Sequence, residues 1–89
     1  MKIGALLEGI VYQGDGNIEV NRIESDSRKV TEGCLFVCIK GYETDGHAYA
    51  EMAAQKGAAA ILAQDEISVS CPVIYTDNTR KAMALILVY

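Results

Sequence analysis

The sequence predicts an α/β fold in which helices flank a small mixed β-sheet. Three observations support it: a globular composition of 51% hydrophobic and 22% charged residues, short apolar runs bounded by turn residues, and a helical stretch between two of those runs. With 89 residues, the chain has room for a single domain. Strands joined through a crossover helix pair in parallel, so the runs of the second half are expected to share one sheet.

Short elements are expected in the first third of the chain. Residues 2–9 are predicted to form a short helix that ends at a glycine, and residues 10–12 a short strand. Residues 14–17 (Gly-Asp-Gly-Asn) have turn chemistry, because glycine adopts positive φ without steric cost. Residues 18–23 alternate imperfectly between apolar and polar side chains, which predicts a further strand. We expect these early strands to be antiparallel partners, which makes the sheet mixed.

The centre of the sheet is expected at residues 35–39, a continuous apolar run between glycine-containing turns. Such a run is typical of a strand buried on both faces. The next helix is predicted over residues 46–56, with Asp45 as its N-cap and Gly57 as its end. Apolar spacing of i, i+3, i+4 and i+7 predicts that its inner face consists of Tyr49, Met52, Ala53 and Lys56.

Two further strands are expected at residues 58–63 and 72–76, followed by a last helix that Asp77 caps. Residues 82–89 are apolar on every side and have no capping residue or charge in their last turn, unlike a finished surface helix. We therefore expect residues 1–89 to be one domain that has been cut from a longer protein. An exposed apolar helix of this kind favours self-association of the chain.

Charge and apolar length argue against two classes of partner. Eight Lys and Arg against twelve Asp and Glu give a net charge of −4, without the basic stripe of a nucleic-acid-binding protein. The longest apolar run falls well short of the roughly 20 residues that span a bilayer. Cys34, Cys38 and Cys71 lack the number and spacing of a disulfide framework or a zinc site, so reduced thiols are expected. These observations predict a cytoplasmic protein that binds neither nucleic acid nor membrane.

Two polar clusters, residues 25–30 and 40–47, flank the apolar run at residues 35–39. Ligands of open α/β sheets bind at loops beyond strand ends, so the two clusters are expected to form one pocket. Ser25 and Ser27 offer hydroxyl groups to the hydrogen-bonding edge of a nucleobase. Backbone N–H groups ahead of the capped helix suit an anion.

Other residues of the clusters have simpler explanations beside the functional ones. Tyr42 is able to lie flat on a ring of a ligand. Asp26 and Arg28 are expected to form a local ion pair more readily than a ligand contact. His47 stands at a helix start without a second His, Cys or acid arranged around it, so neither a catalytic nor a metal role is expected. Spacing alone therefore predicts a small α/β domain that binds a polar ligand.

A family resemblance rests on four segments that keep their order and spacing between residues 22 and 85. They read Asp26-Ser27-Arg28-Lys29-Val30, Gly33-x-Leu35-Phe36-Val37-x-Ile39-Lys40-Gly41, Asp45-Gly46-His47 and Ala53-x-x-x-Gly57-Ala58. Together they closely resemble the opening domain of the Mur ligases. The resemblance implies the amino-terminal, UDP-binding domain of an enzyme of peptidoglycan synthesis, cut before the central domain.

The resemblance also implies a substrate and its contacts. Mur ligases of this kind are cytoplasmic and extend the peptide of UDP-N-acetylmuramoyl-alanyl-glutamate, coupling ATP hydrolysis to amide-bond formation through an acyl phosphate. Their first domain holds the UDP end of the substrate. The family's nucleotide contacts fall on Ser25 and Ser27, and on the stretch Tyr42, Glu43 and Thr44, where backbone contacts are the safer inference.

Catalysis is not expected from these 89 residues. The family binds ATP and magnesium in its central domain, through a glycine-rich phosphate loop that ends in Lys-Thr. The glycines at 14 and 16 are not followed by Gly-Lys-Ser or Gly-Lys-Thr, so they do not form that loop. We therefore expect no catalytic residue, no metal ligand and no cofactor here, and the missing ligase domains as partners.

Three identities stay open at this point. Residues 72–74 (Pro-Val-Ile) and Asp77-x-x-Arg80-Lys81-Ala82 resemble the MurE type, UDP-N-acetylmuramoyl-tripeptide synthetase, more than the MurF type. A MurF-type domain is the first alternative, and a regulatory or interaction module with the same fold but no ligand is the second. The choice of added amino acid, diaminopimelate or lysine, falls to a domain that this sequence does not include.

Overall fold

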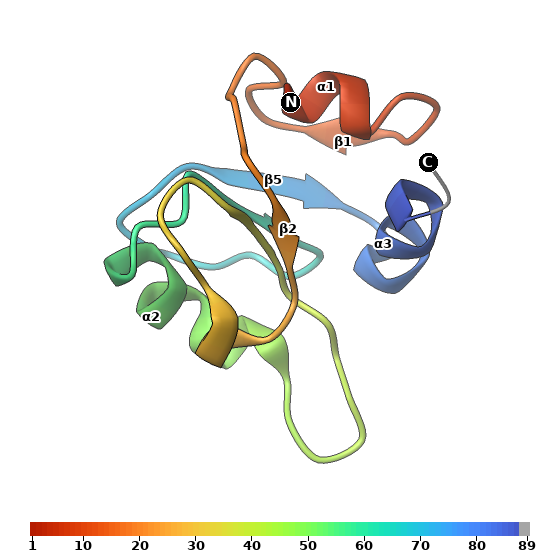
Figure 1. The fold of residues 1–89 in the computed structure, drawn as a ribbon. Coiled ribbons are helices and arrows are strands. Elements are labelled where there is room, and N and C mark those ends of the chain that lie inside the picture. Colours follow the sequence, from red (N-terminus) through yellow and green to blue (C-terminus); the bar gives the residue numbers. More distant parts are fainter. Residues whose placement is uncertain (88–89) are drawn as a thin grey trace.

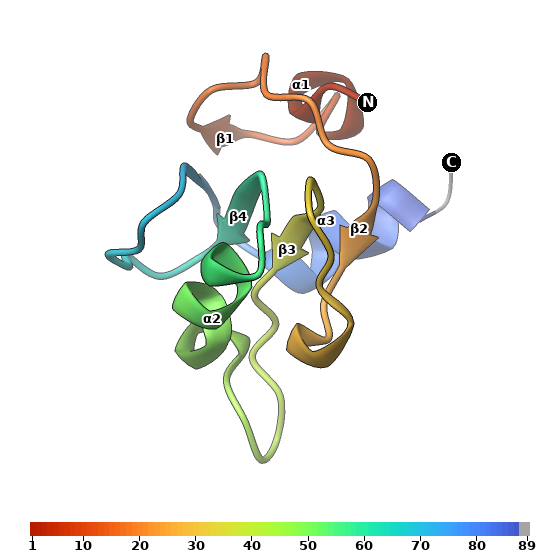
Figure 2. The same ribbon diagram turned by 60° about the vertical axis from the view of Figure 1, so that its left-hand side comes forward.

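The computed structural model describes residues 1–87, which form one five-stranded sheet with helices on both faces (Figures 1 and 2). The strands lie in the order β1-β5-β4-β3-β2. Neighbours from β2 to β5 are parallel, and β1 pairs antiparallel with β5. The bounds are β1 Tyr12–Gln13, β2 Ile23–Glu24, β3 Leu35–Val37, β4 Ala60–Ala63 and β5 Val73–Thr76. The predicted fold class, a small mixed sheet flanked by helices, is confirmed.

In the part of the chain that the structure describes, three α-helices and two 3-10 turns accompany the sheet. The helices are α1 (Ile3–Leu6), α2 (Ala50–Gln55) and α3 (Thr79–Leu87), and the 3-10 turns are η1 (Ser27–Lys29) and η2 (Gly46–Tyr49). Figure 1 shows α2 on one side of the sheet and α1 and α3 on the other. Within residues 1–87, no helix combines the length and the apolar character that crossing a membrane requires.

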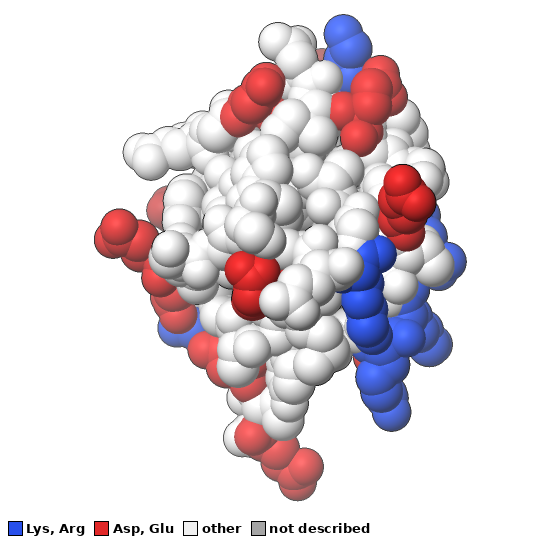
Figure 3. Space-filling view, turned by 90° about the vertical axis from the view of Figure 1, so that its left-hand side faces the viewer, with Lys and Arg blue, Asp and Glu red and all other residues white. Residues whose placement is uncertain are grey.

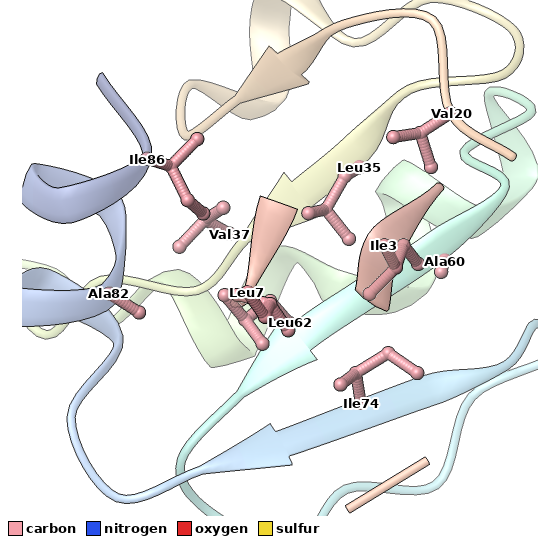
Figure 4. Packing of buried hydrophobic residues seen from close by; sticks show 10 residues of the cluster. All are labelled: Ile3, Leu7, Val20, Leu35, Val37, Ala60, Leu62, Ile74, Ala82 and Ile86. Atoms are coloured by element: carbon pink, nitrogen blue, oxygen red, sulfur yellow. The ribbon is translucent and has the colours of Figure 1, made fainter. Parts of the chain in front are cut away.

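The apolar strands are buried on both faces, as the continuous runs predict. Alternate residues of each strand point to opposite faces, and so each strand serves two cores. The core under α1 and α3 contains Ile3, Leu7, Val20, Leu35, Val37, Ala60, Leu62, Ile74, Ala82 and Ile86 (Figure 4). The core under α2 contains Val30, Cys34, Phe36, Cys38, Ala50, Ala53, Ala58, Ile61 and Ala63.

The strand expected at residues 18–23 is largely wrong. Only the last of these residues belongs to a strand, β2, and β2 runs parallel to β3 rather than antiparallel. The segment changes its partner as it proceeds: Ile18 and Val20 bond with the backbone of the first three residues, whereas Asn21 donates to Gly33. No single ladder therefore forms along it, although Val20 is buried as an apolar strand residue would be.

The helix expected over residues 46–56 begins as the 3-10 turn η2 and becomes α-helical at Ala50. A 3-10 turn advances about 120° per residue and an α-helix about 100°, so the inner face is shifted from the predicted one. Ala50 and Ala53 are buried, whereas Met52 is 46% exposed. The end at Gly57 is confirmed, because this glycine has a φ of +100° and donates to Ala54 in a Schellman motif.

The last helix is capped by Asn78 rather than by Asp77. The Asn78 side-chain oxygen accepts a hydrogen bond from the backbone N–H of Lys81 at 3.0 Å, which is the N-cap geometry. The helix buries Ala82 and Ile86 and leaves Leu85 44% exposed, so it packs on the sheet with one side. The last two residues of the apolar run at 82–89 lie outside the described residues, and self-association through this helix stays a prediction.

Candidate functional site

A groove of about 550 Å³ opens beyond the carboxyl ends of β2 and β3. These strands are parallel neighbours, so the segments that follow them leave the sheet at the same edge. One wall is the segment 25–28 with the turn η1, and the other is the hairpin of residues 40–45 with the start of η2. The lining residues are Ser25, Asp26, Ser27, Arg28, Ile39, Gly41, Thr44, Gly46, Tyr49 and Met52.

The wall formed by residues 25–28, called the serine wall below, is held by carboxylates that accept hydrogen bonds from its backbone. Glu24 Oε1 accepts from the N–H groups of Ser25 and Asp26, both at 3.0 Å. Asp26 caps the turn by accepting from the Arg28 N–H, and it also binds the Arg28 guanidinium through two bonds of 3.0 and 2.9 Å. These bonds lower the pKa of Asp26 to about 2. The expected local ion pair is thus present.

The two serine hydroxyl groups are left available to a ligand. Among the described residues neither the Ser25 nor the Ser27 hydroxyl has a hydrogen-bond partner. The Ser27 carbonyl accepts from Lys56 Nζ of the α2 end at 2.9 Å. The backbone of the wall is therefore fixed, while both serines line the groove.

The hairpin wall is shaped by backbone bonds. Gly41 donates to the Thr44 carbonyl at 2.8 Å, and Lys40 and Asp45 form a β-bridge at the base of the hairpin. Gly46 donates to the Ile39 carbonyl at 2.8 Å, and a Cβ atom on Gly46 would lie 2.7 Å from the Ile39 nitrogen. Only glycine therefore allows η2 to start this close to the end of β3.

His47 is a structural residue with both ring nitrogens engaged. Its Nδ1 lies 2.6 Å from Asp45 Oδ1, and its Nε2 accepts from the N–H groups of Gln64 and Asp65 at 3.1 and 3.2 Å. The pKa of Asp45 is lowered by hydrogen bonds from the His47 backbone and then from its ring. Asp45, His47 and Asp65 place ligand-type atoms within 4.8 Å of one another, but Asp65 pairs with Lys40 Nζ at 2.7 Å. Two acids therefore lie around His47, contrary to the expectation from the sequence, and both are engaged in bonds within the protein.

Comparison with known proteins decides the family. The model described as Mur ligase family, catalytic domain, matches residues 19–87. The chain belongs to the Mur ligase family. It is 47% identical over 92 residues to UDP-N-acetylmuramoyl-L-alanyl-D-glutamate--2,6-diaminopimelate ligase of Listeria innocua, a match that covers the whole chain and 19% of that protein. The same ligase of Bacillus licheniformis is 51% identical over 75 residues, covering 84% of this chain and 15% of that protein. The chain spans less than a fifth of the length of these relatives.

Solved Mur ligase structures share the fold. MurF from Acinetobacter baumannii superposes with a TM-score of 0.78 at 21% identity, over 93% of this chain and 18% of that chain. MurF from Thermotoga maritima, in complex with ADP, gives a TM-score of 0.68 at 30% identity over 75% of this chain and 16% of that chain. The predicted fold, that of a Mur ligase amino-terminal domain, is therefore confirmed.

The Mur ligase chain places the five predicted contact residues in two groups. Ser25, Ser27 and Thr44 line the groove together. Glu43 and Tyr42 lie at the exposed tip of the 40–45 hairpin and do not line it, and Tyr42 is fully exposed. Tyr42 faces instead a neighbouring hollow of about 420 Å³ with Lys40, Gly41 and Arg80. The ligand roles of all five residues stay predictions.

Three residues that line the groove were not predicted from the sequence to belong to the site. Ile39 was expected inside the central strand, and Tyr49 and Met52 on the inner face of the helix; all three line the groove. The 3-10 start of the helix, which turns Met52 outward, has no signal in apolar spacing. The groove therefore combines a polar rim with an apolar wall, as small-molecule sites commonly do.

Charge on this Mur ligase domain is unevenly distributed. In Figure 3, most of the visible Lys and Arg side chains gather at the right-hand edge, with others at the top and lower left, while Asp and Glu are scattered over the face. Arg28 and Lys56, both exposed, belong to the serine wall and its support. The charged residues that line the groove itself, Asp26 and Arg28, neutralise each other in an ion pair.

The glycines at 14 and 16 serve packing. A Cβ atom on Gly14 would lie 2.5 Å from the Ile74 side chain, and one on Gly16 would lie 2.3 Å from the Tyr12 hydroxyl. Gly16 also accepts from the Gly4 N–H at 2.8 Å. Ile74 and Tyr12 thus leave no room for a side chain at either position.

Proposed function

We propose that this chain is the amino-terminal domain of a MurE-type ligase and that its groove holds the UDP part of UDP-N-acetylmuramoyl-dipeptide. The observation that carries the proposal is the convergence of Ser25, Ser27 and Thr44 on one groove at the carboxyl ends of two parallel strands. The groove volume, about 550 Å³, falls in the range of about 300–1,000 Å³ that small-molecule sites occupy. The curated relatives carry the UDP-N-acetylmuramoyl substrate in their names.

Each wall contributes a different interaction to this proposal. The hydroxyls of Ser25 and Ser27 donate to and accept from the polar edge of uracil. The apolar side chains of Tyr49 and Met52 cover the base and the ribose from the side of α2. Backbone N–H groups of the 40–45 hairpin, together with Arg28 at the rim, offer donors to the diphosphate. Binding and orientation of the nucleotide are thus the work of this domain.

Catalysis belongs, in this proposal, to other domains of the parent enzyme. The parent is a cytoplasmic, ATP-dependent ligase that forms an amide bond, and it holds ATP and magnesium in a central domain. The glycines at 14 and 16 are not followed by the Gly-Lys-Ser or Gly-Lys-Thr of a phosphate loop. The domain alone therefore anchors substrate and forms no bond.

The MurE type is preferred over the MurF type because of sequence identity. Curated diaminopimelate ligases are 42–51% identical to this chain, whereas MurF structures share its fold at 20–30% identity. Diaminopimelate is accordingly the proposed incoming amino acid of the parent enzyme. MurF-type function is the second candidate.

An amide-shift titration with UDP-N-acetylmuramoyl-alanyl-glutamate tests the proposal, with ATP as the control ligand. We expect saturable shifts at Ser25, Ser27 and Thr44 and no saturable response to ATP. One domain offers only part of the full site, so the expected dissociation constant is in the high micromolar to millimolar range, about −4 to −6 kcal/mol.

A matched pair of variants makes the titration specific. Ser27→Ala removes a groove hydroxyl, whereas Ser68→Ala removes an exposed hydroxyl on the loop between β4 and β5. Weaker binding by the first variant alone supports the groove as the site. A folded wild-type chain that shows no shifts up to millimolar ligand would refute the proposal and favour an interaction module with this fold.

A further inference from the structure

The base of the 40–45 hairpin is bonded from the first turn of α3, which lies some forty residues further along the chain. Arg80 Nη2 donates to the Lys40 carbonyl at 2.8 Å. The preceding residue, Thr79, is fully buried, and its hydroxyl donates to the Cys38 carbonyl at 2.6 Å. The backbone N–H of Thr79 donates to Gln64 Oε1 at 3.2 Å. The first turn of α3 is thus fixed to two carbonyl groups of the chain that leaves β3.

The geometry of an extended chain explains why both carbonyls are available. Successive carbonyl groups point to opposite sides, so those of Cys38 and Lys40 face one side and that of Ile39 faces the other. The Ile39 carbonyl accepts from Gly46, on the return strand of the hairpin. The root of the hairpin is therefore held from two directions, by its own backbone on one side and by Arg80 on the other.

We propose that Arg80 is a positioning residue for nucleotide binding, because its guanidinium holds the Lys40 carbonyl and so fixes the 40–45 hairpin as a wall of the groove. This inference rests on the proposed function. Arg80 is exposed and lines the hollow beside the hairpin rather than the groove, so it acts through Lys40. The Lys40 side chain forms an ion pair of 2.7 Å with Asp65, so Lys40 is bonded to α3 through its carbonyl group, which accepts from Arg80.

The test uses three variants of the 89-residue chain. Arg80→Met removes the donor and keeps an extended side chain, and Arg80→Lys keeps the charge and a single ammonium donor. Lys81→Met is the matched control, since it removes the same charge from the next, exposed residue of α3. Two quantities are measured for each: the dissociation constant for UDP, and the hydrogen-exchange rate of the Gly41 amide in the ligand-free protein.

Loss of one exposed, charge-assisted bond should weaken UDP binding by about three- to tenfold in Arg80→Met. The Gly41 amide, which is bonded to Thr44, should exchange faster in the same variant before any ligand is added. Arg80→Lys should lie between this variant and the wild type, and Lys81→Met should match the wild type in both measurements.

Three results would overturn the inference. Equal behaviour of Arg80→Met and Lys81→Met would show that the bond to Lys40 is without consequence. Weaker UDP binding with unchanged exchange at Gly41, fully restored in Arg80→Lys, would show that Arg80 touches the phosphates directly. If the wild-type chain binds no UDP, equal exchange at Gly41 in Arg80→Met and the wild type would refute both the bracing of the hairpin and the proposed function. Faster exchange in Arg80→Met would in that case uphold the bracing but refute the proposed function, and with it the role of Arg80 in nucleotide binding.

Discussion

Replacement of His47 by alanine should destabilise the domain strongly, because its ring links two segments of the fold. The ring, whose side chain is 7% exposed, joins the start of η2 to the loop after β4 through bonds to Asp45, Gln64 and Asp65. At about 1 kcal/mol net per hydrogen bond, losing three costs about 2–3 kcal/mol. A domain of this size has a total stability of about 4–13 kcal/mol, so the loss is a large fraction.

Urea unfolding followed by circular dichroism at pH 7 measures the loss in free energy of unfolding. In a thermal scan, the melting temperature should fall by about 10–20 °C, because about 1 kcal/mol corresponds to 4–8 °C in a domain of 60–100 residues. The amides of Gln64 and Asp65 lose their acceptor and should exchange faster than those of the sheet. Glu66→Ala, on the same loop and exposed, is the control and should change the free energy of unfolding by less than about 0.5 kcal/mol.

A free energy of unfolding for His47→Ala within about 0.5 kcal/mol of the wild-type value would refute a bracing role of the ring. Unprotected amides at Gln64 and Asp65 in the wild-type protein would also refute it, since the ring nitrogen would then not be their acceptor. A large loss of stability without any change at these two amides would assign the effect to the vacated space.

Three further predictions concern the groove and the thiols. Gly46→Ala forces a Cβ atom against backbone at 2.7 Å and should cost about 1–3 kcal/mol in urea unfolding. The folded pKa of Asp26 lies at about 2, below the unfolded value, so its contribution to stability is present above about pH 4 and is lost as the pH falls toward 2. Asp26→Asn should therefore flatten that part of the acid-unfolding curve. With a thiol reagent at pH 8, the half-buried Cys71 should react first, because it is more accessible than the buried Cys34 and Cys38. Cys34 and Cys38 should react only on unfolding. Burial also raises the pKa of Cys38 to about 12, which keeps this thiol protonated and unreactive.

The central strands β3 and β4 could be predicted because a strand that is covered by helices on both faces of the sheet needs apolar residues throughout. Their residues are apolar without alternation and are all buried. The helix end at Gly57 was equally readable, since a left-handed position after a helix calls for glycine. Residues 18–23 carried no comparable rule, because their backbone partners come from two separate parts of the chain, residues 1–3 and residues 33–35.

The candidate site was predictable only in part. Parallel neighbours end at the same edge, so Ser25, Ser27 and Thr44 meet once β2 is placed beside β3. Tyr42 was placed in the pocket by its chemistry, but the hairpin carries it to an exposed tip. The bond from Arg80 to the hairpin joins distant residues through a backbone carbonyl, and a backbone acceptor leaves no mark on the sequence.

The two walls of the groove differ in what holds them, and this bears on which substitutions the domain tolerates. The serine wall is fixed by side chains that accept from its own backbone, so changes at Glu24 or Asp26 act directly on the position of the serines. The hairpin is fixed at its root by backbone bonds and from outside by α3, while the side chains at its tip make none of these bonds. Residue type at 42 and 43 is thus unconstrained by the fold. Any selectivity that the tip contributes to nucleotide binding can therefore change without loss of the wall that carries it.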